Sequence, residues 1–357
     1  MVLASLVIVQ HALVLTGHED SVQVGLAAVT RQATYGDLAV GGFFALSGFL
    51  LWGSSQRHSS MSFLRLRFFR LFPGFWAALL VVAFVFAPAI AWVGQRSGAF
   101  VLVGPDSAVT YVVRNLGLVI FQPTIGAVLE GNPHPQGLDG SFWTLAPEFL
   151  CYMGLLVLVR VAHGSFRWNS VVLASAAGGS TIVFGIAAPL LGPGRGDTLS
   201  LLASLAAAFF TGSLIGCRGW LKDARWGLVA AAGVSLALAL ALGLWLPFGP
   251  ALLTVFVVSL GAAIRTGFAA KVGTRVDLSY GMYLYHFPVI QLLVAAGLTA
   301  TTATLAVVGI APLVWLITLP FAAMSWFVVE SPAQMLGRRV TSRKQSPAVG
   351  PRTETPR

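Results

Sequence analysis

Long apolar runs follow one another along almost the whole chain, separated by short segments rich in polar, glycine and proline residues. A helix that crosses the hydrocarbon core of a bilayer needs about 20 predominantly apolar residues. Measured against that length, the pattern predicts ten spanning helices and therefore an all-α fold, a polytopic transmembrane helix bundle. The predicted spans cover about residues 1–16, 37–53, 72–93, 143–159, 170–191, 199–217, 226–246, 250–266, 279–297 and 304–329.

Basic residues are unevenly distributed between the alternate connections, and this asymmetry predicts the orientation. Cytoplasmic loops of membrane proteins carry an excess of lysine and arginine. If the N-terminus is cytoplasmic, most of the 22 basic residues fall on the cytoplasmic side, and both termini lie there. The basic residues left on the outer side are then Arg31, Arg96, Arg114 and Arg195.

The composition excludes a freely soluble enzyme. Apolar residues make up 57% of the 357 positions and charged residues only 10%, whereas a soluble domain carries roughly 25% charged residues. A net charge of +10 would favour nucleic-acid binding in a soluble domain, but here the basic residues follow the topology, so no nucleic-acid partner is expected. Cys151 and Cys217 lie inside apolar runs, and we expect core residues rather than a disulfide.

The segments outside the predicted spans are short. In the longest outer connection, about 94–142, we expect an interfacial or re-entrant helix from Val109 to Phe121. The Gly/Pro-rich run from Thr124 to Gly140 is expected to form a loop, because proline cannot continue a helix. Residues 1–336 should thus form one membrane-embedded domain, and residues 337–357 a basic, disordered cytoplasmic tail.

Several ionisable residues lie in predicted spans, where a charge costs about 2.5 to 3.5 kcal/mol on insertion scales and needs a partner or a function. His11 is either hydrogen-bonded across a helix interface or a general base that takes a proton from a hydroxyl group. Glu148 is either part of a buried ion pair or a group that orients an imidazole or acts as acid or base. Glu330, at the end of the last span, is expected to be an ordinary interfacial carboxylate.

Arginines alternate with aromatic residues from Phe63 to Pro73, just before the third span. One interpretation is topology determination with contacts to lipid headgroups. The other is that the guanidinium groups of Arg65, Arg67 and Arg70 grip the phosphates of a cytosolic, nucleotide-bearing donor. Charge alone does not separate the two.

These features belong to a series of motifs in a fixed order. The motifs are His11, FFALSGFLLW from Phe43 to Trp52, FLRLRFFRLFPGFW from Phe63 to Trp76, GSFWTLAPEFLCY from Gly140 to Tyr152, LSYGMYLYHFPV from Leu278 to Val289, and ESP from Glu330 to Pro332. Over nearly its whole length the chain thus resembles the integral-membrane acyltransferases of acyltransferase family 3. The resemblance implies transfer of an acyl group, commonly acetyl, from acyl-coenzyme A to a sugar hydroxyl in polysaccharides, lipids or glycosylated natural products.

The resemblance also implies roles for individual residues. His11 corresponds to the proposed catalytic histidine of the family. Arg67 and Arg70 correspond to its Arg-x-x-Arg pair, which is linked to the acyl donor, and Arg65 is their neighbour. Glu148 falls on the acidic position that follows a tryptophan, here Trp143.

Other motif positions are expected to line the substrate path or to pack. Ser279, Tyr280 and His286 match the late Ser-Tyr...His motif, for which we expect packing or lining of the path rather than chemistry. Ser47 belongs to the second-span motif. Asp37 is the nearest acidic residue before Phe43, although the spacing differs from that of the family.

The N-terminus departs from the family pattern. The family usually places an arginine eleven residues before the catalytic histidine, and that position falls just before Met1. The first span is also shorter than about 20 residues. We therefore expect the natural chain to start upstream of Met1; the alternative is a signal peptide.

We expect an enzyme of the bacterial inner membrane with acyl-coenzyme A as co-substrate, a glycan or glycolipid acceptor and no metal. The donor would bind at the cytoplasmic face while His11, oriented by Glu148, deprotonates the acceptor; in a variant, the acyl group passes through a covalent intermediate on His11. Two alternatives stay open, a transporter or flippase of a glycan or lipid, and an inactive relative.

Overall fold

The computed structural model describes residues 1–22, 32–162, 165–187, 189–192, 194–221, 223–264 and 276–342. Within these ranges the chain is helical and forms no β-strand, which confirms the predicted all-α class. The helices are α1 (Val2–Leu15), α3 (Tyr35–Arg57), α4 (Ser60–Val81), α5 (Ala87–Val93), α6 (Ala108–Asn115), α7 (Leu145–Val161), α8 (Phe166–Ile182), α9 (Arg195–Arg218), α10 (Trp226–Ala241), α11 (Trp245–Ala263), α13 (Ser279–Ala295), α14 (Ala303–Leu305), α15 (Ala311–Ser325) and α16 (Ser331–Ser342).

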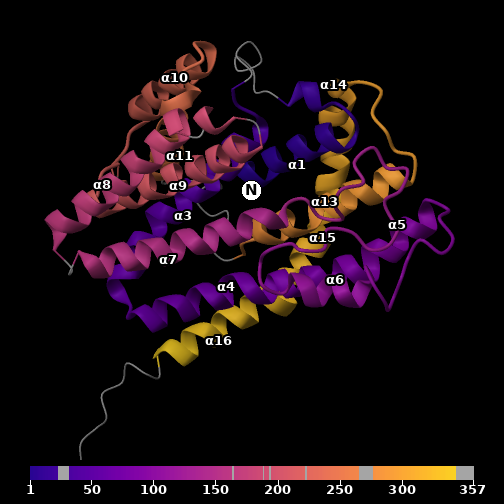
Figure 1. The fold of residues 1–357 in the computed structure, drawn as a ribbon. Helices are drawn as coiled ribbons and strands as arrows, with labels where there is room; N and C mark the ends of the chain where they lie inside the picture. Colours follow the sequence, from indigo (N-terminus) through magenta and orange to yellow (C-terminus); the bar gives the residue numbers. More distant parts are fainter. Residues whose placement is uncertain are drawn as a thin grey trace, which may run out of the picture.

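The long helices form two groups with α1 and α7 between them (Figure 1). One group contains α3, α8, α9, α10 and α11, and the other contains α4, α13, α15 and α16. Helix α1 packs against α3 of the first group and against α13 of the second. A residue on α1 therefore lies at the boundary of the two groups.

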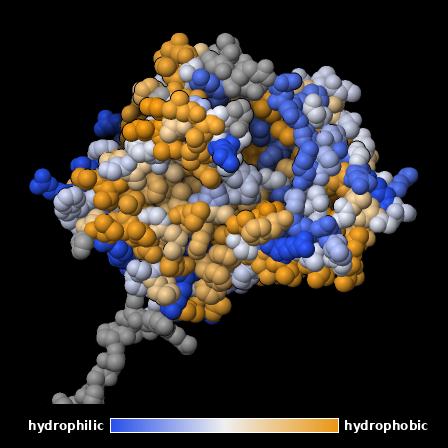
Figure 2. Space-filling model, viewed as in Figure 1, coloured by the Kyte–Doolittle hydropathy of each residue, from blue (hydrophilic) through white to orange (hydrophobic). Residues whose placement is uncertain are grey.

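Six helical stretches of the described chain are long and apolar enough to cross a membrane, and several shorter apolar helices accompany them. Each of the ten predicted spans falls on a helix, although ten crossings remain a prediction. Apolar side chains cover most of the face seen in Figure 2. Val171 of α8 is 52% exposed and Val234 of α10 is 59% exposed, as expected where lipid replaces water. The chain is a multi-pass membrane protein.

Helices α3 and α9 approach closely because glycines of each helix lie against the backbone of the other. A Cβ atom on Gly48 of α3 would lie 1.9 Å from the carbonyl oxygen of Phe209, and one on Gly212 of α9 would lie 2.2 Å from that of Ala45. Small residues allow such backbone contact between membrane helices. This interface fixes the wall of the bundle that carries Ser47.

The arginine-aromatic segment forms the first turns of α4. The third span was predicted to begin at residue 72, but the helix begins at Ser60, where the side chain of Ser59 accepts a hydrogen bond from the backbone N–H of Ser62. Because α4 begins there, Arg67 and Arg70 lie inside a continuous helix, one turn apart.

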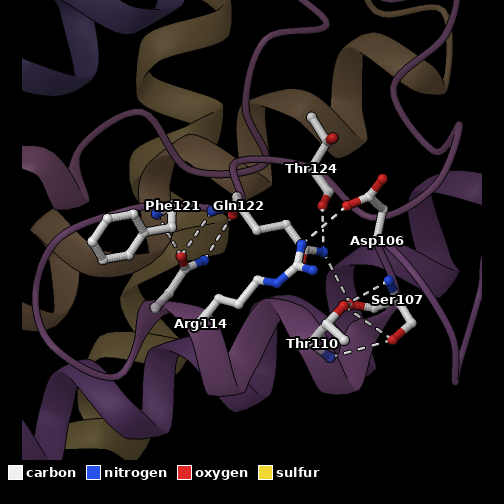
Figure 3. A network of polar contacts seen from close by, with 8 residues as sticks. Asp106, Ser107, Thr110, Arg114, Phe121, Gln122 and Thr124 are labelled. Atoms are coloured by element: carbon white, nitrogen blue, oxygen red, sulfur yellow. Dashed lines mark hydrogen bonds and ion pairs between the residues drawn. The ribbon is translucent and has the colours of Figure 1, made fainter.

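The connection between α5 and α7 folds back through a polar network (Figure 3). Helix α6 ends at Asn115, whereas the sequence predicted a helix to Phe121. The reason is that the Asn115 side chain accepts hydrogen bonds from the backbone N–H groups of Phe121 and Gln122, at 2.9 and 3.0 Å, which turns the chain. Arg114 adds an ion pair to Asp106 at 3.3 Å. The segment is thus an ordered cap that leads into α7.

The last helix extends beyond residue 336, where the sequence predicted the domain to end. Helix α16 continues to Ser342 and packs along α4, where a Cβ atom on Gly337 would lie 2.9 Å from the side chain of Phe69. The remainder of the predicted tail, residues 343–357, lies outside the described residues.

Candidate active site

Two adjoining pockets lie where the helix groups meet. The first, the small pocket, has a volume of about 190 Å³ and is lined by residues of α1, the start of α3 and the turn before α7, including His11. The second, the large cavity, has a volume of about 750 Å³ and includes Arg67, Arg70 and Glu148 in its wall. The residues shared by both walls are Val40, Thr144, Leu253 and Tyr283.

His11 and His286 form a hydrogen-bonded pair. His11 Nδ1 lies 2.7 Å from His286 Nε2, and the two ring planes are within 15° of parallel with their centroids 5.0 Å apart, so the rings meet edge to edge. His286 is fully buried and lines neither pocket, whereas His11 is half-buried and lines the small pocket. The sequence placed His286 among packing or path-lining residues; the structure places it directly behind His11.

Polar and aromatic groups surround His11 in the small pocket. Trp143 is 38% exposed and lines it together with Ser141. Asp37 also lines it, but its carboxylate caps α3 by accepting hydrogen bonds from the backbone N–H and the hydroxyl of Thr34, both at 2.8 Å. The Asp37 carboxylate is therefore already used in helix capping.

The boundary between the two pockets is a hydrogen-bonded pair of side chains. The Thr144 and Tyr283 hydroxyl oxygens lie 2.6 Å apart, and Tyr283 also donates to the backbone carbonyl of Ser141 at 2.8 Å. Because Thr144 and Tyr283 belong to both walls, the small pocket and the large cavity are neighbours rather than separate sites.

Glu148 faces the large cavity and not His11. Its carboxylate accepts hydrogen bonds from Ser47 at 3.1 Å and from Tyr152. Within the described chain it makes no hydrogen bond to His11, and the orientation of the imidazole by Glu148 stays a prediction. The physical reason for the missing bond is helix geometry, since Glu148 on α7 meets α3 at Ser47 while His286 of α13 occupies the side of His11.

Arg70 is neutralised by two carboxylates. Its guanidinium lies 2.8 Å from Asp277 and 3.4 Å from Glu330, and it stacks over the ring of Tyr280 at 5.2 Å. Glu330 is 1% exposed and also accepts a hydrogen bond from Ser325 at 2.8 Å. Glu330 is therefore a buried partner of Arg70 rather than the ordinary interfacial carboxylate expected from the sequence.

Arg67 differs from its neighbour one turn away. It lines the large cavity, makes no ion pair among the described residues, and its buried Nε has no hydrogen-bond partner. Arg65 lines neither pocket. The Arg67 guanidinium lies over the ring of Phe63 at 5.9 Å. Of the three arginines grouped by the sequence, Arg67 alone lines the cavity without a carboxylate partner among the described residues.

The motif from Leu278 to Val289 contributes residues to the large cavity and a residue that contacts His11 of the small pocket. Ser279 and Tyr280 line the large cavity, where the Ser279 hydroxyl donates to Asp277 at 2.5 Å and the Tyr280 hydroxyl donates to the carbonyl of Leu71 at 2.8 Å. Further along α13, His286 reaches His11. One helix thus connects the arginine end of the large cavity to the histidine of the small pocket.

Sequence reasoning missed several residues of this arrangement. Tyr152 follows Glu148 by one helical turn and Tyr283 precedes His286 by one turn, so helical periodicity was the available signal for both. Asp277 had no such signal, because its partner Arg70 is far away in the sequence. Among the residues that the structure describes, no group of three or more His, Cys, Asp or Glu side chains could hold a metal ion.

The chain matches the family model described as an acyltransferase domain over residues 1–325. It is 27% identical over 332 residues to nodulation protein 10 of Rhizobium leguminosarum bv. viciae, an alignment that covers 86% of this chain and 84% of that protein. It is 25% identical over 314 residues to an O-acetyl transferase of Shigella phage Sf6, covering 82% of this chain and 84% of the relative. No solved structure matches. The match extends over nearly all of the helical bundle, so the chain belongs to acyltransferase family 3 and is a membrane acyltransferase.

Proposed function

We propose that this enzyme transfers an acetyl group from acetyl-coenzyme A, bound in the large cavity, to a sugar hydroxyl in the small pocket. The observation that carries the proposal is the arrangement of two polar groups across adjoining pockets. His11, whose neutral imidazole has one nitrogen that can accept a proton, lines one pocket, and Arg67, whose Nε has no hydrogen-bond partner, lines the other.

The large cavity suits a phosphate-bearing donor through Arg67. The buried Nε of Arg67 lacks a hydrogen-bond partner, which is costly, and a phosphate group would satisfy it through short, charge-assisted hydrogen bonds. Arg70 contributes differently, because Asp277 and Glu330 already neutralise it. We assign Arg70 to holding α13 and α16 against α4, and Arg67 to binding coenzyme A.

The small pocket suits a sugar. Trp143 offers an aromatic ring, and Gln10 and His11 bring polar side chains to the same pocket. Such a combination of an apolar surface and a few placed polar groups is typical of small-molecule sites. The phage relative is by name an O-acetyl transferase, which supports a hydroxyl oxygen as the acceptor atom.

In the proposed reaction His11 acts as a general base. It takes the proton of the acceptor hydroxyl while that oxygen attacks the carbonyl carbon of the thioester. The new C–O bond forms, the C–S bond breaks, and the sulfur of coenzyme A leaves with the proton that His11 returns. Glu148, held by Ser47 and Tyr152, belongs in this scheme to the wall of the donor cavity.

The proposed orientation follows the distribution of basic residues. With ten crossings and both termini in the cytoplasm, the large cavity lies toward the cytoplasmic ends of α3 and α11, where its wall includes Leu50 and Ile264. The small pocket lies toward the outer end, where its wall includes Thr34 at the start of α3. Acetyl-coenzyme A would thus enter from the cytoplasm of a bacterium and the glycan from the outer side.

The test is release of coenzyme A by the purified protein in nanodiscs, measured with a thiol reagent in the presence of acetyl-coenzyme A and a panel of glycans. We expect acceptor-dependent release, lowered roughly 10²- to 10⁴-fold in His11→Ala and unchanged in the control His58→Ala, whose residue lines neither pocket. Acceptor-independent release in one equivalent, with acetylated protein, would instead indicate a covalent intermediate. Equal activity of wild type and His11→Ala would refute the role of His11.

A further inference from the structure

We propose that His286 is a positioning residue that fixes the tautomer and the orientation of His11. The inference rests on the proposed role of His11 as the base, and it deepens that role by naming the group that holds the base. The starting observation is the hydrogen bond between the two rings, which joins residues 275 positions apart in the chain.

The backbone of α13 determines which nitrogen of His286 carries the proton. His286 Nδ1 lies 3.1 Å from the carbonyl oxygen of Met282 and 2.9 Å from that of Tyr283. A carbonyl oxygen only accepts hydrogen bonds, so Nδ1 must be the donor. In a neutral imidazole the other nitrogen, Nε2, is then an acceptor.

The same reasoning assigns the proton on His11. Its Nδ1 lies 2.7 Å from the accepting Nε2 of His286, so Nδ1 of His11 must carry the proton. Nε2 of His11 is left with its lone pair, which is the form that a general base requires. Two backbone carbonyls thus select, through one intervening ring, the reactive tautomer of His11.

Orientation supports this assignment. His286 is fully buried behind His11 and lines neither pocket. Its hydrogen bond to His11 occupies the Nδ1 edge of the His11 ring. His11 makes no second hydrogen bond among the described residues. Its Nε2 is nevertheless not one of the fully buried polar atoms without a partner, so this nitrogen is not sealed inside the protein. Nε2 is therefore accessible from the small pocket that His11 lines.

The turn that carries His286 is itself fixed by the segment before α7. The Ser141 hydroxyl lies 3.1 Å from the carbonyl oxygen of Tyr283, and the Tyr283 hydroxyl donates to the carbonyl of Ser141 at 2.8 Å. The ring of Phe287 packs against His11 edge-on, with centroids 4.9 Å apart. The imidazole pair thus has little freedom to rotate, as pre-organised catalytic groups require.

Two variants of His286 separate positioning from packing. His286→Leu removes the acceptor and should lower kcat about 10- to 100-fold, the size of effect seen when a group that orients a metal-bound histidine is lost. The KM for acetyl-coenzyme A should not change, because His286 does not line the large cavity. In His286→Gln the side-chain oxygen can take the place of Nε2 and accept from His11, so this variant should recover most of the lost kcat. The control is His58→Leu, which should behave as wild type.

A second measurement does not depend on activity. Nitrogen-15 NMR of protein labelled at its six histidines, with the His11 signals assigned by their loss in His11→Gln, reports which ring nitrogen carries the proton. We expect the Nδ1-protonated tautomer in wild type and in His286→Gln, and a mixture in His286→Leu. If no acyl transfer is found at all, the proposed function fails, while this spectrum still tests the pairing.

Three results would overturn the proposal. They are a wild-type kcat in His286→Leu, a His286→Gln variant no more active than His286→Leu, and an Nε2-protonated His11 in wild type. Because the spectrum is recorded on wild-type protein, a leucine variant that fails to fold would not leave the proposal undecided.

Discussion

Single residues of one motif have different roles, and Arg67 and Arg70 illustrate this. The two lie one turn apart on α4, yet Arg70 contacts two carboxylates and Arg67 contacts none among the described residues. Sequence reasoning treated both as ligands of the donor, because a charge pattern does not reveal which charges are already paired. The distinction depends on Asp277 and Glu330, which come from distant parts of the chain.

We expect Arg67→Gln to raise the KM for acetyl-coenzyme A about 10- to 100-fold with little change in Tm. The reason is that a hydrogen bond to a charged group contributes about 1.5 to 3 kcal/mol, and each 1.4 kcal/mol is about tenfold in affinity. Arg65→Gln is the matched control, since Arg65 lines neither pocket. Identical KM values in the two variants would exclude Arg67 from the donor site.

Arg70→Gln should instead lower the Tm in detergent, because it leaves the buried Glu330 carboxylate without its partner. Breaking a buried ion pair costs about 3 kcal/mol or more. Arg70→Gln combined with Glu330→Gln removes both charges and should restore part of the lost Tm. A single variant as stable as wild type would show that the ion pair is not needed for folding.

Asp139 predicts a pH dependence of stability. It lies before α7 and is 6% exposed; burial raises its pKa to about 8 from an ordinary value of 3.8. The native state therefore keeps a proton that the unfolded chain loses, so stability falls as the pH rises from about 4 to about 8. The Tm of wild type should decline over that range more steeply than that of Asp139→Asn, which has no proton to lose. Parallel curves would contradict this assignment.

At the scale of helices, apolar run length predicted where helices occur but not their ends or their neighbours. The arginine segment belongs to α4 although hydropathy placed it before the span, because the cap at Ser59 starts the helix earlier than the apolar run. The contact between His11 of α1 and His286 of α13 joins two motifs that the sequence marked separately. Glu148 was marked correctly as a polar residue in a span, but its neighbours depend on how α7 packs on α3, which local sequence does not contain.

At the α3–α9 interface, we expect a glycine-to-alanine substitution to have the opposite of its usual effect on stability. Glycine to alanine in a helix normally stabilises it by about 1 kcal/mol. Gly212→Ala should do the opposite and cost about 2 kcal/mol, because the new Cβ would lie 2.2 Å from the carbonyl oxygen of Ala45. Gly178→Ala on α8 is the control, since a Cβ there meets no atom within 4 Å. A Tm for Gly212→Ala at or above that of Gly178→Ala would refute the close approach.

At the scale of the whole molecule, the distribution of basic residues predicted an orientation, and the two pockets give that orientation a function. Cysteine substitutions in a variant lacking Cys151 and Cys217 test it. Glu130→Cys, on the connection before α7, should react with a membrane-impermeant maleimide in intact cells, whereas Ser342→Cys, at the end of α16, should react only after permeabilisation. Both residues are exposed, so the reverse pattern would invert the proposed topology.

The central claim is that His11 catalyses acyl transfer from a donor in the large cavity to an acceptor in the small pocket. The two substrates reach these pockets from opposite sides of the membrane. The most direct measurement uses proteoliposomes of known protein orientation with radiolabelled acetyl-coenzyme A on one side and a glycan acceptor on the other. We predict labelled glycan when the donor is on the side of the α16 end and the acceptor is on the side of the α5–α7 connection, and none with His11→Ala. Labelled glycan formed only when donor and acceptor share one side would contradict the account.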